Sequence, residues 1–372
     1  MNVAHASTAH LSRPGGRIAY DVTGEGRLVI CIPGMGDVRS VYRFLGPTLA
    51  EAGFRVATMD LRGHGDSDTT FDAYDDVAAA TDVLALAQDL GGPTILVGNS
   101  MGAGAACWAA AEQPDLVVGL VLLGPFVRQG KADPFGTLLF LAALLRPWGN
   151  AAWKAYFRTL YPTRHDAEYD SHFVEVAENL RMPGHWDAFH ATTHTSHAPV
   201  EARLGEVLAP TLVVMGEKDP DFPDPFAEAR WVAERLHGEI LMVPDAGHYP
   251  QAEFPDVVSP AVVEFVRRLT APVTDAPQAG RQSPSGRTRS STKAYSSWHT
   301  ARGHTTPRPG RCLPVPSRRP TMPQAALYRS DTCRRPTETG ITCRSIWRQL
   351  EEKALVDHYG KTYAEHRATT RF

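Results

Sequence analysis

The chain has 372 residues, of which 43% are hydrophobic and 21% charged, a composition ordinary for a globular protein with one large domain or two small ones. Its longest strongly apolar run, residues 138–145, is far shorter than the roughly 20 residues of a membrane-spanning helix, and the N-terminus lacks the apolar region of a signal peptide. Five cysteines, an odd number without a CxxC pair, argue against a disulfide framework or a zinc site. We therefore expect a cytoplasmic protein that uses no metal ion and no cofactor.

Short apolar runs alternate with helical patterns along the first 270 residues. Strands are predicted at residues 16–22, 27–32, 54–60, 93–97, 118–123, 211–215 and 239–243. Helices are predicted at residues 41–52, 74–90, 101–112, 226–236 and 257–269. Continuous apolar strands separated by helices indicate a parallel sheet that is covered on both faces. The predicted fold class is therefore α/β, with a mostly parallel, doubly wound sheet.

The alternation of strands and helices stops between about residues 125 and 208. This stretch has helical patterns and many aromatic residues, but no convincing strand. We interpret it as a helical insertion, or cap, that lies over the sheet. Its aromatic residues and the apolar run 138–145 favour an apolar group in the substrate, although the same residues would also suit the core of the cap itself.

The composition changes after residue 270. Residues 1–270 carry 20 basic and 34 acidic side chains, a formal charge of −14, whereas residues 271–372 carry 18 and 7, a charge of +11. The second part is rich in Pro, Arg, Ser and Thr and poor in large aliphatic residues, which predicts a disordered tail with a short helical segment near residues 341–364. We expect this tail to have no role in catalysis. The alternative is that its positive charge binds nucleic acid or an anionic surface.

The strongest chemical signal is the segment at residues 98–102, which reads Gly-Asn-Ser-Met-Gly. It follows the predicted strand 93–97 and opens the predicted helix 101–112. This context makes a G-x-S-x-G pattern a nucleophile elbow, in which Gly98 and Gly102 let the strand and the helix approach closely around Ser100. We therefore predict that Ser100 is a nucleophile.

A serine hydroxyl is a poor nucleophile at neutral pH and needs a base. The chain has 15 histidines, and His248 is the best candidate among them. It follows the last predicted strand and precedes the final helix, so its loop can reach the edge of the sheet at which Ser100 lies. We predict that His248 is the base.

The base needs a carboxylate that fixes its tautomer and stabilises the imidazolium. Asp219 follows the predicted strand 211–215, and the chain order Ser100, Asp219, His248 is one that catalytic triads use. Asp221 and Asp224 lie two and five residues further on, and either of them remains an alternative to Asp219.

Acyl transfer also requires hydrogen-bond donors for the oxyanion. The backbone N–H of Met101, directly after the predicted nucleophile, is one expected donor. The Gly-rich loop at residues 33–36 follows the strand 27–32 and can bring its backbone to the same place. We predict that the backbone N–H of Met35 is the second donor.

Residues 16–270 resemble the α/β-hydrolase superfamily, in its cap-bearing branch with a serine nucleophile. The matching segments are Pro33-Gly34-Met35-Gly36, Asp60-Leu61-Arg62-Gly63-His64-Gly65-Asp66-Ser67, Gly98-Asn99-Ser100-Met101-Gly102, Gly216-Glu217-Lys218-Asp219 and Gly247-His248. The resemblance implies an α/β-hydrolase catalytic domain at residues 1–270 that contains the cap. The segment 60–67 resembles a family hallmark that braces the loop after its strand. The family usually has His-Gly where this chain has Pro33-Gly34, which removes a side chain that often braces the oxyanion loop.

Three functions remain open at this point. The first is a serine hydrolase that acts on a small, partly apolar, ester-like substrate, because members of the superfamily that open epoxides or remove halides resemble this chain but use Asp as nucleophile. The second is a carbon–carbon hydrolase, because residues 98–102 and the end of the cap at 201–206 resemble enzymes that cleave products of aromatic meta-ring fission. Those enzymes usually have a Trp where this chain has Tyr249. The third is a non-catalytic member of the fold that binds a small ligand.

Overall fold

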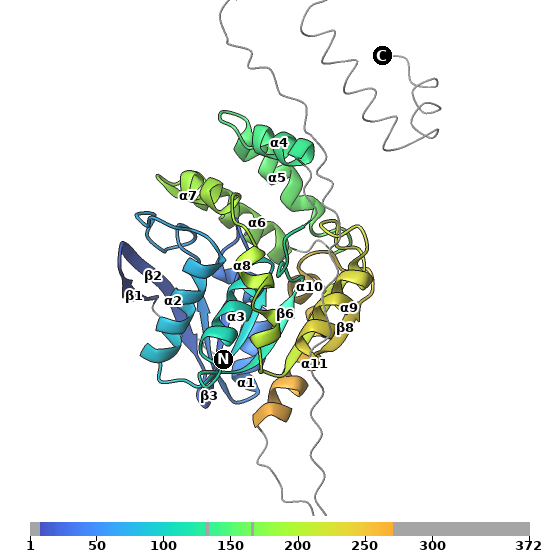
Figure 1. Ribbon diagram of the computed structural model, residues 1–372. Coiled ribbons are helices and arrows are strands. Elements are labelled where there is room, and N and C mark those ends of the chain that lie inside the picture. The colour runs from blue at the N-terminus through green and yellow to red at the C-terminus, as the bar shows by residue number, and fades with distance from the viewer. Residues whose placement is uncertain (1–7, 131–133, 165–166, 271–372) are drawn as a thin grey trace, which may run out of the picture. The chain divides into compact units, whose positions relative to one another are not determined.

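The computed structural model describes residues 8–130, 134–164 and 167–270 (Figure 1). The predictions for residues 271–372, including the segment near 341–364, lie outside the described residues. The strands are β1 (Ala9–Arg13), β2 (Gly16–Thr23), β3 (Arg27–Ile32), β4 (Phe54–Met59), β5 (Thr94–Asn99), β6 (Val117–Leu123), β7 (Thr211–Gly216) and β8 (Glu239–Val243). The α-helices are α1 (Leu45–Glu51), α2 (Asp76–Asp89), α3 (Met101–Glu112), α4 (Pro134–Ala143), α5 (Gly149–Thr159), α6 (Ala167–Asn179), α7 (His185–Thr192), α8 (Ala198–Glu201), α9 (Pro225–Leu236), α10 (Pro250–Glu253) and α11 (Pro255–Thr270). Two 3₁₀ helices are η1 (Arg39–Tyr42) and η2 (Leu204–Glu206).

The strands of the described residues form one sheet in the order β1-β2-β4-β3-β5-β6-β7-β8. β1 pairs with β2 and β2 with β4 in antiparallel fashion, and all the other neighbours are parallel. The predicted α/β class with a mostly parallel sheet is therefore confirmed. None of the helices in the described ranges combines the length and the apolarity that a bilayer crossing requires.

The two faces of the sheet bury separate sets of apolar side chains. Successive residues of a strand point to opposite faces, so Ile30 and Ile32 of β3 pack with α2, α3 and α9, whereas Val29 and Cys31 pack with α1 and α11. Figure 1 shows α2 and α3 next to each other against the sheet. The double cover explains why the central strands are apolar on both faces, and it fixes where their carboxyl ends emerge.

The chain between β6 and β7 is helical in the described residues and contains α4 to α8 and η2. Figure 1 shows α4, α5, α6 and α7 grouped at one end of the sheet. The aromatic residues of this cap pack mainly on each other: the ring centroid of Trp153 lies 4.6 Å from that of Phe189 and 6.4 Å from that of Phe157. Much of the aromatic content that the sequence shows therefore belongs to the cap's own core.

Two local predictions differ from the structure. The helix expected at residues 41–52 is divided into η1 and α1, because Pro47 lacks an N–H and is tolerated in the first turn of a helix, which here begins at Leu45. The edge strand β1 was not predicted. It is only five residues long, and its sequence AHLSR has a weak apolar alternation.

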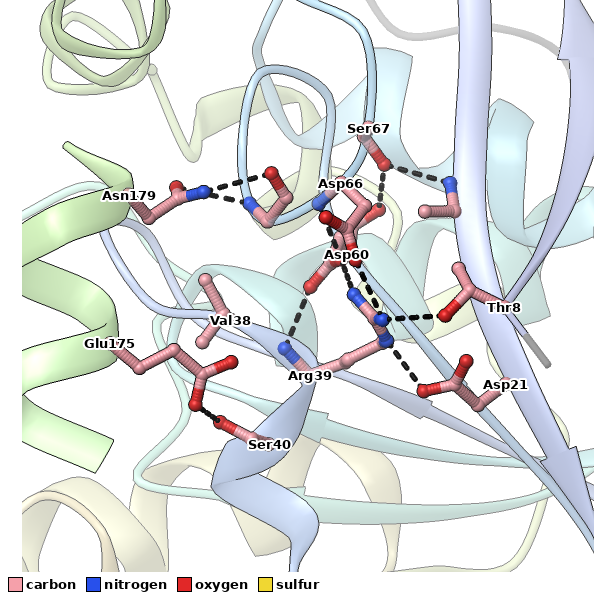
Figure 2. Close-up of polar contacts among 12 residues, drawn as sticks. Thr8, Asp21, Val38, Arg39, Ser40, Asp60, Asp66, Ser67, Glu175 and Asn179 are labelled. Atoms are coloured by element: carbon pink, nitrogen blue, oxygen red, sulfur yellow. Dashed lines mark hydrogen bonds and ion pairs between the residues drawn. The ribbon is translucent and has the colours of Figure 1, made fainter. Parts of the chain in front are cut away.

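The segment 60–67 is held by a polar network that Figure 2 shows around Arg39. The buried Asp60 accepts hydrogen bonds from the backbone N–H groups of Arg39, at 2.7 Å, and Asp66, at 3.0 Å, and also pairs with the Arg39 guanidinium. That guanidinium reaches Asp21 at 2.6 Å and Asp66 at 2.8 Å. Burial raises the pKa of Asp60 to about 6, although the charge of Arg39 opposes this rise. The positive charge of Arg39 therefore compensates the charge of the Asp60 carboxylate, which is buried away from water.

Asn179 connects the cap to the same segment (Figure 2). Its side-chain amide accepts a hydrogen bond from the backbone N–H of Gly65 at 3.1 Å and donates one to the carbonyl of Gly65 at 2.8 Å. Ser40, next to Arg39, donates to Glu175 of α6 at 2.7 Å. The hallmark segment therefore supports both the body of the domain and α6 of the cap.

Replacing Arg39 by methionine is expected to lower the free energy of unfolding by about 3–5 kcal/mol, because it leaves the Asp60 carboxylate buried without its charge partner. Urea unfolding measures the loss. Arg17→Met is the matched control, because Arg17 pairs with Asp68 on the surface and its side chain is 57% exposed. A similar loss of stability in both variants would contradict a special role for Arg39.

Candidate active site

Ser100 lies in the turn between β5 and α3, at φ 54° and ψ −120°. A positive φ is unusual for a residue with a side chain, and this backbone conformation is strained. The flanking glycines are required by close packing. A Cβ on Gly98 would lie 2.3 Å from the carbonyl oxygen of Gly102, and a Cβ on Gly102 would lie 2.4 Å from that of Ile32. The turn therefore has the geometry of a nucleophile elbow.

His248 lies in the loop between β8 and α10, where it is 2% exposed. Two contacts fix its backbone. Its N–H donates to the carbonyl of Leu160 in the cap at 2.9 Å, and its carbonyl accepts from the side chain of Asn99 at 3.2 Å. Asn99 directly precedes Ser100, so the loop that carries His248 is attached to the elbow itself.

The three candidate carboxylates have different surroundings. Asp219 is buried, and its Oδ2 lies 2.8 Å from Nδ1 of His248. Asp221 is 3.5 Å from the same nitrogen and also accepts a hydrogen bond from the hydroxyl of Tyr156 in α5. Asp224 caps α9 by accepting a hydrogen bond from the N–H of Ala227 at 2.9 Å. The structure thus places Asp219 as the direct partner of His248, with Asp221 beside it.

The two carboxylates dominate the electrostatics of His248. Burial lowers the pKa of the imidazole, but the charges of Asp219 and Asp221 outweigh this effect and raise it to about 9. Burial also raises the pKa of Asp221, and the neighbouring charge of Asp219 adds to the rise. The two carboxylates therefore stabilise the protonated form of His248, which is the form that a base adopts after it has removed a proton.

The loop at residues 33–36 lies against the elbow. A Cβ on Gly34 would lie 2.9 Å from the Cβ of Ser100, so only a glycine allows this approach. Among the described residues, the backbone N–H groups of Met35 and Met101 donate no hydrogen bond. Met35 and Met101 also line the cavity on which Ser100 lies, so their unpaired N–H groups are compatible with the predicted role as oxyanion donors.

His64 braces this loop, a contact that was not predicted from the sequence. Its Nε2 accepts a hydrogen bond from the N–H of Gly36 at 3.0 Å, and its Nδ1 donates to the carbonyl of Arg62 at 2.8 Å. Burial lowers the pKa of His64 to about 4, which keeps the ring neutral and able to accept. His64 of the hallmark segment 60–67 thus braces the oxyanion loop in place of the side chain that Pro33-Gly34 lacks. The presence of a histidine in that segment was the only sign of this contact in the sequence.

The sequence model of the family described as "alpha/beta hydrolase fold" matches residues 27–255, which is more than half of the chain. The chain belongs to the α/β-hydrolase fold family. This is a family of enzymes, and the relatives that the chain matches are named as such.

Among these relatives, a 2-(acetamidomethylene)succinate hydrolase of Mesorhizobium japonicum is 28% identical over 68% of this chain and 92% of its own length. A 2-hydroxy-6-oxo-6-phenylhexa-2,4-dienoate hydrolase of Comamonas testosteroni is 30% identical over 68% of this chain and 91% of its own. The solved structure of Est816, described as an N-acyl homoserine lactone degrading enzyme, is 25% identical with a TM-score of 0.59, and the match covers 70% of this chain and 99% of that one.

In this α/β-hydrolase, a cavity of about 230 Å³ lies beside Ser100 and His248. Its described lining is Met35, Ser100, Met101, Phe126, Phe140, Trp153, Tyr156, Leu160, Thr192, Thr193, Thr195, His197, Asp221, His248 and Tyr249. Cap and body both contribute to the wall, and neither Lys nor Arg occurs among these residues. The hydroxyl of Ser100 has no hydrogen bond to any described residue, so it is available to a bound molecule.

The group Asp219, Asp221 and His248 also has the composition of a metal site, since one ligand atom of each lies within 4.8 Å of the others. These atoms already have partners. Nδ1 of His248 is bonded to Asp219, and Asp221 accepts from Tyr156. The contacts within the group are those of a hydrogen-bonded ion pair that orients an imidazole.

Proposed function

We propose that the protein is a serine hydrolase that cleaves a small, uncharged and partly apolar ester. The observation that carries the proposal is the 2.8 Å contact between Asp219 and Nδ1 of His248, on the cavity that the strained Ser100 also lines. A carboxylate on Nδ1 leaves Nε2 of the imidazole as the atom that can accept the proton of a serine. A protein that only binds a ligand has no need of this arrangement.

The proposed reaction has two halves. Ser100 Oγ attacks the ester carbonyl while His248 removes its proton, and the N–H groups of Met35 and Met101 bind the oxyanion that forms. His248 then gives this proton to the leaving alcohol as the carbon–oxygen bond breaks, which leaves an acyl group on Ser100. Water attacks the acyl group with His248 again as base, and the acid product departs.

The cavity indicates the chemical class of the substrate. Most of the described lining is apolar or aromatic, including Phe126, Phe140 and Trp153. Among the described lining residues, Asp221 is the only one of the types Asp, Glu, Lys or Arg. A substrate with its own carboxylate would meet this charge and would find no Lys or Arg on the described wall to bind it, so an uncharged acyl group fits better.

Carbon–carbon hydrolysis is the second candidate, because relatives named as 2-hydroxy-6-oxo-dienoate hydrolases are up to 30% identical to this chain. The names of their substrates denote carboxylates. The described lining of the cavity offers no Lys or Arg for such a group, and this favours the ester over the dienoate.

A substrate panel distinguishes the two candidates. We expect the protein to hydrolyse p-nitrophenyl esters of short and medium acyl chains, and to do so better than the matched half-esters of dicarboxylic acids. A yellow conjugated dienone acid is the comparison, since its colour fades only when the carbon–carbon bond is cleaved. Fading of the dienone without any ester hydrolysis would replace the first candidate by the second.

The rate of ester hydrolysis is expected to rise with pH through the alkaline range. His248 must be neutral to act as a base, and its pKa of about 9 is above the usual value of 6.5, so the acid limb of kcat/KM should lie unusually high. Asp221→Asn removes one of the two charges that raise the pKa of His248, so the acid limb of the kcat/KM profile should move to lower pH. Asp224→Asn, which changes the cap of α9, is the control and should leave the limb in place. An unmoved limb in Asp221→Asn would contradict the assignment.

A further inference from the structure

A second histidine–aspartate pair lines the same cavity. Nδ1 of His197 lies 2.7 Å from Oδ2 of Asp76. Asp76 is buried at the start of α2 in the body of the domain, whereas His197 directly precedes α8 at the end of the cap. The pair fixes the orientation of the His197 ring, because the carboxylate determines the side on which Nδ1 lies.

The other ring nitrogen of His197 is free for a ligand. Its Nε2 has no hydrogen-bond partner among the described residues, and the side chain is 18% exposed and lines the cavity. The ring of Phe126 is close to both histidines, with its centroid 5.7 Å from that of His197 and 5.7 Å from that of His248. Nε2 of His197 is therefore a free acceptor on the cavity wall near His248, the proposed base, and is separate from it.

Thr195 adds a second unsatisfied group to this wall. Its hydroxyl is buried and has no hydrogen-bond partner in the described residues. The neighbouring threonines of the wall differ, because Thr192 donates to the carbonyl of Phe189 at 2.6 Å and Thr193 to that of His190 at 2.7 Å. A buried hydroxyl without a partner is unfavourable, and a ligand in the cavity can supply the partner.

The surroundings favour an uncharged partner for these two residues. Asp76 stands directly behind His197, Asp221 lies on the wall, and the described lining contains no Lys or Arg. A carboxylate on the ligand at this position would meet the like charges of Asp76 and Asp221 and find no Lys or Arg. An ammonium group would find the Asp76 carboxylate already paired with His197. A neutral group that both donates and accepts hydrogen bonds satisfies a threonine hydroxyl and an imidazole at once.

We propose that Thr195 and His197 bind an uncharged hydrogen-bonding substituent of the substrate, a hydroxyl or an amide, at a distance from the ester carbonyl that Ser100 attacks. Asp76 acts through His197 and is a positioning residue. The inference rests on the proposed ester hydrolysis and specifies its substrate class. The cavity would then hold an apolar acyl chain that carries one polar substituent.

Matched esters test the proposal. The p-nitrophenyl esters of butyric acid, 2-hydroxybutyric acid and 3-hydroxybutyric acid differ only in one hydroxyl and its place. The wild type should prefer a hydroxylated ester in kcat/KM. Thr195→Val and His197→Asn should each reduce this preference about 3- to 10-fold, the effect of one lost hydrogen bond, because the loss on the hydroxylated ester should exceed any loss on the butyrate ester. Asparagine keeps a donor for Asp76 but lacks an atom at Nε2.

Thr193→Val is the matched control, because Thr193 lines the same wall but its hydroxyl already has a partner, and this variant should keep the preference. An unchanged preference in Thr195→Val and His197→Asn would overturn the proposal. An equal loss on all three esters would also overturn it, since that result indicates a structural role.

Binding without turnover separates this proposal from the proposed function. Calorimetry on the Ser100→Ala protein can compare butyramide with 3-hydroxybutyramide, which both fill the cavity without reacting. Tighter binding of the hydroxylated amide, lost in a Ser100→Ala, Thr195→Val double variant, would support the polar site even if no ester were hydrolysed. Equal binding of the two amides would overturn it, whatever the result of the ester panel.

Discussion

Replacing Ser100 by alanine is expected to lower kcat/KM for ester hydrolysis by about 10⁴- to 10⁶-fold, because it removes the atom that forms the acyl intermediate. Far-UV circular dichroism and the urea midpoint should remain close to those of the wild type, since alanine keeps the Cβ that packs against Gly34. Ser259→Ala is the control. Ser259 is also buried, but its hydroxyl lies in α11 and has no partner among the described residues, so activity should persist.

A second pair of substitutions at Ser100 tests whether the backbone of the elbow is strained. Glycine adopts φ 54° and ψ −120° at lower cost than a residue with a side chain, so Ser100→Gly should be about 1 kcal/mol more stable than Ser100→Ala. Urea unfolding of the two inactive variants gives the difference directly. A less stable glycine variant would show that the backbone at Ser100 is relaxed and that the elbow stores no strain.

Replacing Asp219 by asparagine is the second large effect, an expected loss of about 10³- to 10⁴-fold in kcat. An amide can present its N–H₂ group to Nδ1 of His248, and this would favour the tautomer that carries its proton on Nε2. That tautomer cannot accept the proton of Ser100. The imidazolium would also lose its nearest compensating charge, which lies 2.8 Å away.

The neighbouring aspartates provide the controls for this experiment. Asp221→Asn should lose less than Asp219→Asn when each variant is assayed at its own optimum pH, because Asp221 lies 3.5 Å from Nδ1 and is partly compensated by Tyr156. Asp224→Asn should retain activity, because Asp224 caps α9. A larger loss in Asp221→Asn than in Asp219→Asn would transfer the role of triad acid to Asp221.

The parts of the site that depend on local sequence were predictable. The elbow at residues 98–102 joins a strand to a helix through a turn within a few residues, so its glycines and Ser100 can be recognised from the sequence alone. The mostly parallel sheet was predictable for the same reason, because its buried strands are continuous apolar runs such as β5 and β6.

The parts that depend on distant contacts were predictable only in part. Chain order indicated Asp219 as the partner of His248, but it could not exclude the neighbouring aspartates. Asp219, Asp221 and Asp224 are similar in sequence context, and only packing shows that one meets His248 while another caps a helix. His197 meets Asp76 across 121 residues of chain. No pattern within the sequence reports which histidine of the cap will face a cavity, because this depends on how the cap packs over the body.

The architecture also connects the cap with the proposed catalytic groups. Leu160 at the end of α5 accepts the hydrogen bond of the His248 backbone, and Tyr156 of the same helix donates to Asp221. The position of α5 therefore influences the position of His248, the proposed base, and the pKa of its imidazole. Changes in the cap should consequently affect the pH profile as well as the choice of substrate.

The most direct test of the central claim, an activated Ser100, is reaction of the purified protein with a fluorophosphonate probe, followed by mass spectrometry of the labelled peptide. The reaction needs no knowledge of the substrate. We predict that the wild type is labelled on Ser100 alone and that Ser100→Ala and His248→Ala are not labelled. A folded wild type that remains unlabelled, or that is labelled equally after His248→Ala, would contradict the account and would favour a ligand-binding role for the fold.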